Sequence, residues 1–234
     1  MVVSDIHKNI ETVRGRIAQA AASVGRDPDQ IKLIAVSKGQ PLEVMVQVAR
    51  TGYIDGIGEN RVQEAKTKKE NWPPELKIPW HMIGHLQRNK VKQAIQIFDV
   101  IQSLDSLELA TVLEERLTAS DNIMPVLIEV NISGEASKYG VSPNNVHSLT
   151  EHILNRCPRL KLLGLMGIGP LTDEEKSISS SFAMLRRIKE TLEKDIGINL
   201  PELSMGMSDD FEIAIKEGST MVRIGRAIFG PRIN

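Results

Sequence analysis

The sequence has little of three things that would mark particular classes of protein. Cys157 is the only cysteine among 234 residues, so no intrachain disulfide can form and a cytoplasmic location is expected. Lys and Arg number 29 against 30 Asp and Glu, and a net charge of −1 argues against nucleic-acid or membrane binding. No apolar run approaches membrane-spanning length, and Asp5, Lys8 and Glu11 interrupt any signal-peptide core.

Aromatic residues are also scarce, at 3% of the chain, so the core must be built from Ile, Leu, Val, Met and Ala. With 41% hydrophobic and 25% charged residues the composition is that of an ordinary globular protein. The length suits one α/β barrel as well as two smaller domains. No low-complexity linker divides the sequence, and we treat residues 1–234 as one domain.

Helical and strand-like patterns alternate along the chain. An amphipathic lead helix is predicted from the spacing of Ile6, Ile10, Val13, Ile17 and Val24. Eight strands follow, at Ile31–Lys38, Tyr53–Glu59, Pro79–Gly84, Asp99–Asp105, Met124–Asn131, Leu160–Ile168, Glu202–Met207 and Thr220–Gly225. Helices are predicted between them, at Leu42–Arg50, Arg61–Lys69, Arg88–Ile97, Ser106–Thr118, Val146–Asn155, Asp173–Lys194 and Asp209–Lys216.

Several of these strands are apolar on both faces, as Val126-Leu127-Ile128 shows. Such strands are typical of a parallel sheet that is covered by helices on one side and packed with side chains on the other. Eight strand–helix units in one domain predict an α/β fold, a single (β/α)8 TIM barrel with the lead helix at its N-terminus. A doubly wound open sheet is the alternative, but no Gly-x-Gly-x-x-Gly turn follows the first strand.

Lys38 closes the first predicted strand, and Gly39-Gln40-Pro41 then stops it. A lysine at the carboxyl end of an apolar strand would lie where α/β barrels place their chemistry. A partly desolvated amine there can lose its proton near neutral pH and form a Schiff base. Taken alone, the same lysine could simply reach solvent.

Small and hydroxyl-bearing residues cluster at the seventh predicted strand. Ser204, Gly206 and Ser208 lie where barrel enzymes often hold a phosphate group with backbone N–H groups. The glycine lets the backbone approach a ligand, and the serine hydroxyls can donate hydrogen bonds. Ser208 and Asp209 could instead cap the next helix, with Asp209 and Glu212 as a capping box, a role compatible with phosphate binding.

Arg223 alternates with Val222 and Ile224 in the eighth predicted strand and shares a face with Gly225. A guanidinium inside a barrel costs several kcal/mol unless it finds an anion or an acceptor. Two explanations stay open, a salt bridge to an interior acid such as Glu129 and a bound cofactor with an anionic group or an aromatic nitrogen. Gly225, like the glycine of the seventh strand, would let a ligand approach the backbone.

Polar side chains gather at the carboxyl ends of other predicted strands as well. They are Glu59, Asn60, His85, Gln87, Asn89, Lys90, Asn131, Ser133, Glu135 and Lys138. Such a gathering indicates a site, although each residue alone could serve a turn or a solvated helix start. His81 and His85 are four apart, but Gly84 lies between them and no helix surrounds them, so no metal site is expected.

Spaced motifs through nearly the whole chain resemble the pyridoxal phosphate homeostasis proteins, which are related to the barrel domain of alanine racemase. The matching pieces are Ala35-Val36-Ser37-Lys38, Gly58-Glu59-Asn60-Arg61-Val62-Gln63-Glu64, His81-Met82-Ile83-Gly84-His85-Leu86-Gln87-Arg88-Asn89-Lys90, Asn131-Ile132-Ser133, Gly164-Leu165-Met166, Ser204-Met205-Gly206-Met207-Ser208, Arg223-Ile224-Gly225 and Phe229-Gly230. Because so many pieces occur in order, the resemblance is specific.

This resemblance implies a barrel that binds pyridoxal 5'-phosphate (PLP) as a Schiff base on Lys38. Ser204, Ser208 and the backbone around Gly206 and Gly225 would hold the phosphate. Arg223 would approach the pyridine nitrogen, where it would weaken the ring as an electron sink. Asn60 would lie near the other edge of the cofactor, and Arg226 would either contact the phosphate or carry a solvated charge.

Three functions compete. The resemblance implies a carrier of PLP, active in PLP and amino-acid homeostasis without robust turnover, with PLP-dependent apo-enzymes as candidate recipients. We expect a monomer, because no added dimerisation domain is recognisable in the sequence. A PLP-dependent amino-acid racemase is the alternative, but it needs a second domain and a tyrosine base. We expect neither, because little sequence follows the eighth strand and Tyr53 and Tyr139 lie away from the expected base position. A Schiff-base aldolase acting on a phosphorylated sugar is the third.

Overall fold

Eight parallel strands close into a barrel in which each strand is hydrogen-bonded to the next in chain order and the eighth pairs with the first. The structure, a computed structural model, describes residues 3–135 and 138–230, so the predicted domain 1–234 extends slightly beyond it. The strands are β1 Lys32–Val36, β2 Gly56–Glu59, β3 Trp80–Met82, β4 Val100–Leu104, β5 Met124–Val130, β6 Leu160–Gly167, β7 Glu202–Ser204 and β8 Met221–Ile224. The predicted (β/α)8 barrel is confirmed.

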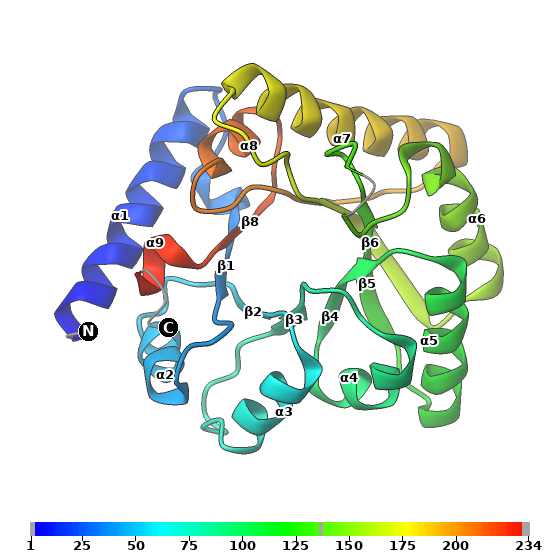
Figure 1. Cartoon of the computed structure of the whole chain (residues 1–234), viewed down its shortest axis with the longest axis horizontal. Helices are drawn as coiled ribbons and strands as arrows, with labels where there is room; N and C mark the ends of the chain where they lie inside the picture. The colour runs from blue at the N-terminus through cyan, green and yellow to red at the C-terminus, as the bar shows by residue number, and fades with distance from the viewer. Residues whose placement is uncertain (1–2, 136–137, 231–234) are drawn as a thin grey trace.

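Helices form a ring outside the strands (Figure 1). They are α1 Val3–Ala22, α2 Leu42–Arg50, α3 Val62–Glu70, α4 Val91–Ile97, α5 Leu107–Ser120, α6 Val146–Arg156, α7 Glu175–Ile196, α8 Phe211–Lys216 and α9 Arg226–Phe229. Short 3-10 turns occur at Pro28–Gln30, Arg88–Lys90 and Pro143–Asn145. The patterns in the sequence located every one of these helices except α9, whose four residues are too few to show a helical period.

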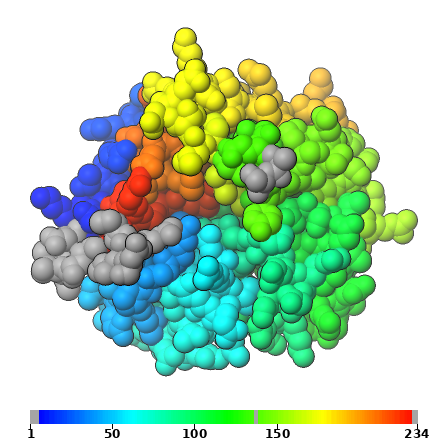
Figure 2. All heavy atoms as spheres, viewed as in Figure 1, coloured from blue at the N-terminus to red at the C-terminus, as the bar shows by residue number. Residues whose placement is uncertain are grey.

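The lead helix α1 closes one side of the ring. Ile6, Ile10, Val13 and Ile17 are each at most 2% exposed, as their helical spacing predicts. The helix lies against α8 and α9, so the blue start of the chain and its red end are neighbours in Figure 2. Arg16 of α1 binds both carboxylate oxygens of Glu212 in α8, at 2.8 and 2.7 Å.

Side chains pack in two layers, one between strands and helices and one inside the barrel. The hydrophobic core includes the large buried side chains of Trp80, Phe182 and Phe211. The inner layer contains Ile34, which lies against β2: a Cβ added to Gly56 would come within 2.9 Å of its Cδ1 atom. Because side chains alternate along a strand, Lys32 shares this inward side of β1 with Ile34.

Several strands end earlier at their carboxyl side than the sequence predicts. β1 stops at Val36, so Ser37 and Lys38 belong to the connection that follows, and β7 stops at Ser204. Gly206 has φ +97°, a conformation that interrupts a regular strand. The carboxyl end of the barrel, which we call the mouth, is therefore lined by irregular backbone.

Candidate functional site

Lys38 lies in a turn directly after β1 and is half-buried at the mouth. Its neighbour in the barrel wall is β8, because β1 pairs with β8 in a register that places Ile34 opposite Arg223. Lys38 follows Ile34 by four residues and lies beyond the carboxyl end of β1, next to the strand that carries Arg223. The two residues that the sequence singled out first therefore belong to neighbouring parts of the barrel wall.

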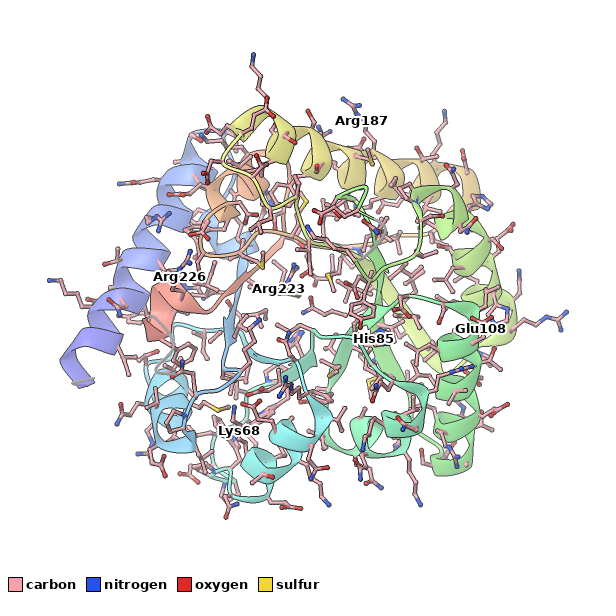
Figure 3. The ribbon with its side chains drawn as sticks, in the orientation of Figure 1. Lys68, His85, Glu108, Arg187, Arg223 and Arg226 are labelled. Atoms are coloured by element: carbon pink, nitrogen blue, oxygen red, sulfur yellow. The ribbon has the colours of Figure 1, made fainter. Side chains whose placement is uncertain are left out.

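Arg223 lies inside the barrel and is only 4% exposed, close to the centre of the view in Figure 3. Its guanidinium donates to Ser204 Oγ at 2.7 Å and to the carbonyl oxygen of Gly167 at 3.0 Å. Burial lowers its pKa to about 10, while the carboxylates of Glu129 and Asp210 act in the opposite direction. Arg223 is therefore still a cation at neutral pH.

The salt bridge considered for Arg223 is not formed. Within residues 3–135 and 138–230, no carboxylate oxygen lies within 4.0 Å of its guanidinium. Glu129 of β5 is near enough to interact through its charge only, and burial raises its pKa to about 7, with a further rise from Asp105 and a reduction from Arg223. The buried cation thus has acceptors but no counter-ion in direct contact.

Ser204 is fully buried beneath Arg223 rather than exposed at the mouth. Besides accepting from the guanidinium, its hydroxyl donates to Gln102 Oε1 at 2.6 Å. The Gln102 amide nitrogen lies 2.8 Å from His81 Nδ1, which must accept because an amide nitrogen can only donate. Burial lowers the pKa of His81 to about 4, so this imidazole is neutral at physiological pH.

These contacts form a continuous column of polar side chains inside the barrel, made of His81, Gln102, Ser204 and Arg223. Sequence reasoning missed Gln102, the residue that joins its two halves. The only available signal was its inward position in the alternating β4 pattern, and a glutamine in a strand is not by itself distinctive.

Ser208 lies near the start of α9. Its Oγ accepts a hydrogen bond from the N–H of Ala227 at 3.2 Å. Gly225 leads into the same helix, and a Cβ there would come 3.3 Å from the carbonyl oxygen of Val36. The hydroxyl and the first backbone N–H groups of α9 therefore share one small region beside the end of β1.

The capping-box interpretation of this segment is wrong. α8 begins at Phe211 with Asp210 at its N-cap and has no side-chain capping bond. Asp209 pairs instead with the exposed Arg226, and Glu212 pairs with Arg16 of α1. The two acids thus bind basic partners that are distant in sequence, which local spacing cannot reveal.

Asn60 follows β2 at the mouth. Its Oδ1 atom is buried, and the described part of the chain offers it no hydrogen-bond partner. Gly84 packs directly on this residue, since a Cβ at Gly84 would come 2.5 Å from the carbonyl oxygen of Asn60. A buried acceptor without a donor costs free energy, so this atom is a natural contact for a ligand.

Other polar residues at the strand ends organise loops. Asn131 donates to the carbonyl oxygens of Glu135 and Lys138, at 2.9 and 3.2 Å. His85 lies 3.1 Å from Asp105 and stacks on Tyr139 with ring centroids 4.1 Å apart. In the part of the chain that the structure describes, no group of three or more His, Cys, Asp or Glu side chains could hold a metal ion.

Cavities border this end of the barrel. One of about 300 Å³ is lined by Glu129, Val130, Asn131, Lys138, Tyr139 and Ile168. A larger one, of about 910 Å³, lies between α1, the connection after β6 and the start of α8, and Met207 and Asp210 are part of its lining. Neither lining includes Lys38, Asn60 or Arg223.

Comparison with known proteins assigns the chain to a family. The model of the alanine racemase N-terminal domain matches residues 5–232. The pyridoxal phosphate homeostasis protein of Aquifex aeolicus (strain VF5) is 41% identical over 225 residues, which cover 96% of this chain and 97% of that protein. The chain belongs to the pyridoxal phosphate homeostasis protein family.

Solved structures extend the comparison. PipY of Synechococcus elongatus PCC7942, a structure with PLP bound, is 32% identical and superimposes with a TM-score of 0.80 over 92% of this chain and 100% of PipY. Alanine racemase of Clostridium difficile 630 is 16% identical with a TM-score of 0.77, over 96% of this chain and 57% of the racemase. This chain and the racemase thus share the barrel fold. A large part of the racemase has no counterpart in this chain.

Proposed function

We propose that this protein binds PLP at the barrel mouth and holds it covalently on Lys38. The observation that supports the proposal is the β1–β8 register, which sets the buried cation Arg223 opposite Ile34, four residues before Lys38 in the turn that follows β1. PipY, a relative of similar length, has been solved with PLP bound. When bound, PLP supplies an aldehyde that condenses with a primary amine with loss of water, and a phosphate dianion.

The residues present fit such a group. Lys38 supplies the amine, while Ser208 and the backbone around Gly225 supply hydrogen-bond donors for a phosphate. The buried Oδ1 of Asn60 lacks a donor within the described residues and would gain one from a ligand hydroxyl. Gly206, whose φ is +97°, bends the chain between these elements.

Arg223 would face the pyridine nitrogen of the ring. A guanidinium can only donate hydrogen bonds, so it keeps that nitrogen unprotonated and leaves the ring a modest electron sink. Ser204 would support the site from below by orienting Arg223, since its hydroxyl already binds that guanidinium and Gln102. Arg226 is exposed and pairs with Asp209, and we assign it a surface charge near the phosphate rather than a direct contact.

We further propose that the protein stores and delivers PLP without turning over amino acids. Of the two tyrosines, Tyr53 lies before β2 at the opposite end of the barrel, and Tyr139 is 60% exposed and stacked on His85. Racemisation requires a positioned acid or base on each face of the substrate carbon, and a missing one costs about 10²–10⁴-fold in rate. Turnover of L- or D-amino acids above about 1 s⁻¹ by the PLP-loaded protein would favour the racemase instead.

The cellular setting completes the proposal. We place the protein in the cytoplasm, on the basis of its single cysteine, as a monomeric single domain that passes PLP to apo-enzymes. In the described part of the chain, no helix has both the length and the apolar character needed to cross a bilayer. Light scattering of the purified PLP-loaded protein should give the mass of one chain, 25.9 kDa.

Borohydride reduction tests the central claim. PLP is added to the purified protein, the imine is reduced, and the adduct is located by peptide mass analysis. We expect the adduct on Lys38, and we expect Lys38→Ala to lose both the adduct and the visible imine absorbance while remaining folded. The exposed Lys66 of α3 provides the control, because Lys66→Ala should retain both signals. An adduct found solely on another lysine would overturn the assignment.

A further inference from the structure

Lys38 is carried by a tight turn that is short of packing contacts. The N–H of Gln40 donates to the carbonyl oxygen of Ser37 at 2.9 Å, and Gly39 has φ +73°, a combination typical of a type II turn. A Cβ added to Gly39 would meet no heavy atom within 4 Å. The Gly39 side of the turn is therefore open, and the backbone contacts on either side of Lys38 help to fix its direction.

A cluster of three charged side chains binds both neighbours of Lys38. We call it the clamp: Glu59 at the end of β2, and Glu64 and Lys68 on α3. Lys68 Nζ donates to the carbonyl oxygen of Ser37 at 2.9 Å, and the N–H of Gly39 donates to Glu64 Oε1 at 2.6 Å. The clamp thus forms hydrogen bonds with the backbone of the residues immediately before and immediately after Lys38.

The clamp is also tied together internally. Lys68 Nζ donates to Glu59 Oε1 at 2.7 Å and to Glu64 Oε1 at 2.6 Å. The Ser37 hydroxyl donates to Glu59 Oε1 at 2.6 Å. Figure 3 labels Lys68 beside the cyan helix α3. Three side chains from two elements therefore act as one unit on the turn.

Burying the charged side chains of the clamp costs free energy, which their mutual hydrogen bonds must offset. Glu59 is fully buried, and burial raises its pKa against the opposing hydrogen bonds from Lys68 and Ser37. Burial also acts to raise the pKa of Glu64, but the hydrogen bonds from Lys68 and Gly39 outweigh it and the pKa is lowered. Buried ion pairs seldom improve on apolar packing in stability, and they are better suited to fixing geometry.

A second lysine–glutamate pair on the same helix shows the contrast. Lys66 and Glu70 are also four residues apart on α3, but their side chains are 45% and 60% exposed and their nitrogen–oxygen distance is 3.7 Å. Among the described residues, neither has a side-chain hydrogen bond to the β1 turn. One helix therefore carries a surface pair and a more enclosed pair, in which Lys68 is buried and Glu64 half-buried, and only the more enclosed pair reaches Lys38's neighbours.

We propose that Glu64 and Lys68, supported by Glu59, are positioning residues that aim Lys38 into the barrel mouth and so set the rate of its covalent attachment to PLP. The inference rests on the proposed function. Its physical basis is that attachment needs the amine within reach of the aldehyde carbon, and small misplacements of reacting groups cost up to about 10²-fold in rate.

Matched variants at Glu64 separate positioning from general stability. Glu64→Gln keeps an oxygen that can accept from the Gly39 N–H, whereas Glu64→Leu cannot accept. Glu70→Leu on the same helix is the control for losing a glutamate and an i,i+4 ion pair. For each protein, stopped-flow absorbance gives the rate of PLP attachment, and calorimetry gives the affinity for pyridoxine 5'-phosphate, an analogue without an aldehyde.

We expect Glu64→Leu to slow attachment about 10–100-fold, while affinity for the analogue stays within about twofold. Glu64→Gln and Glu70→Leu should attach PLP within about twofold of the parent rate. Lys68→Met should slow attachment at least as much as Glu64→Leu. Thermal melts establish that each variant used is folded.

Two results would overturn the inference: parental attachment rates in a folded Glu64→Leu protein, or equal losses of attachment and of analogue binding, which would mark a structural role. Failure of the proposed function is distinguishable from both. In that case the unaltered protein itself would give no reduced adduct on Lys38.

Discussion

Polar groups at the two ends of the barrel interior differ in how completely they are paired. At the amino end, Lys32 forms an ion pair with Glu202, whose other oxygen accepts from the Thr220 hydroxyl at 3.0 Å. At the carboxyl end, Arg223 has hydroxyl and carbonyl acceptors but, among the described residues, no carboxylate in contact. There too Asn60 keeps a buried oxygen that no described donor reaches.

Charges at the amino end are matched by each other, so they need no further partner. Charges and acceptors at the mouth are only partly matched, and burial raises the pKa of Glu129 and lowers that of Arg223. Unmatched buried polar groups raise the free energy of the folded state, and a ligand that satisfies them gains affinity from the same source.

Arg223→Met would change the mouth most. We expect the affinity for PLP to fall about 10–100-fold through loss of a charge-assisted contact. The free energy of unfolding should change by less than about 2 kcal/mol, because the desolvation cost of the cation disappears along with its hydrogen bonds. Absorbance titration and urea denaturation measure the two quantities. If PLP affinity were unchanged and stability fell strongly, Arg223 would stabilise the fold, as the charges at the amino end do, and would not bind the ligand.

The pH dependence of the stability of a Glu129→Gln variant tests the same comparison between the two ends of the barrel. The pKa of Glu129 is about 7 in the folded protein against 4.5 ordinarily, so the folded state holds one more proton between these values and loses stability as pH rises through them. Gln mimics the protonated acid. We therefore expect the variant to match the parent near pH 4.5 and to exceed it by about 2–3 kcal/mol at pH 8.

Chemical denaturation at the two pH values measures this difference. His81 titrates in the opposite direction, since its lowered pKa of about 4 makes the folded state lose stability as pH falls below 6.5. It is present in both proteins and cancels from their difference. Glu108→Gln, at an exposed site labelled in Figure 3, serves as the control and should follow the parent at both pH values. A parental stability profile for Glu129→Gln would contradict the prediction.

We expect Lys32→Met to have the smallest effect, and to lower the stability of the protein rather than its affinity for PLP. It leaves the nearly buried Glu202 with the Thr220 hydroxyl alone, and we expect a loss of about 1–2 kcal/mol in the free energy of unfolding. The loss is limited because the lysine side chain is 49% exposed and its charge is screened by solvent. Affinity for PLP, measured by the same titration, should be unchanged. A matching drop in affinity would show that the two ends are coupled.

Much of the fold could be predicted from the sequence because it depends on local patterns. Short apolar runs separated by helical periods locate every strand within a few residues, and Leu42–Arg50 is predicted with the bounds of α2. Lys38 and Arg223 were recognisable for a similar reason, since each is a charged residue set in an apolar strand pattern.

The contacts of the site were harder to predict. Ser204 was expected at the phosphate, yet it lies within the interior column because β7 ends there and its side chain points inward toward Gln102. Asp209 and Glu212 were expected to cap a helix, yet Arg226 and Arg16 bind them. Each outcome depends on residues far away in the sequence, whose proximity no local pattern encodes.

By itself the sequence determined the alternation of strands and helices, the closed barrel that eight such units favour, and the lysine and arginine that mark its mouth. Only the tertiary structure decided which polar groups satisfy one another. Glu59, Glu64 and Lys68 lie on a strand and helix that follow Lys38, and they meet its turn because β2 pairs with β1. Periodicity sets which way a side chain faces, whereas barrel closure sets what it meets there.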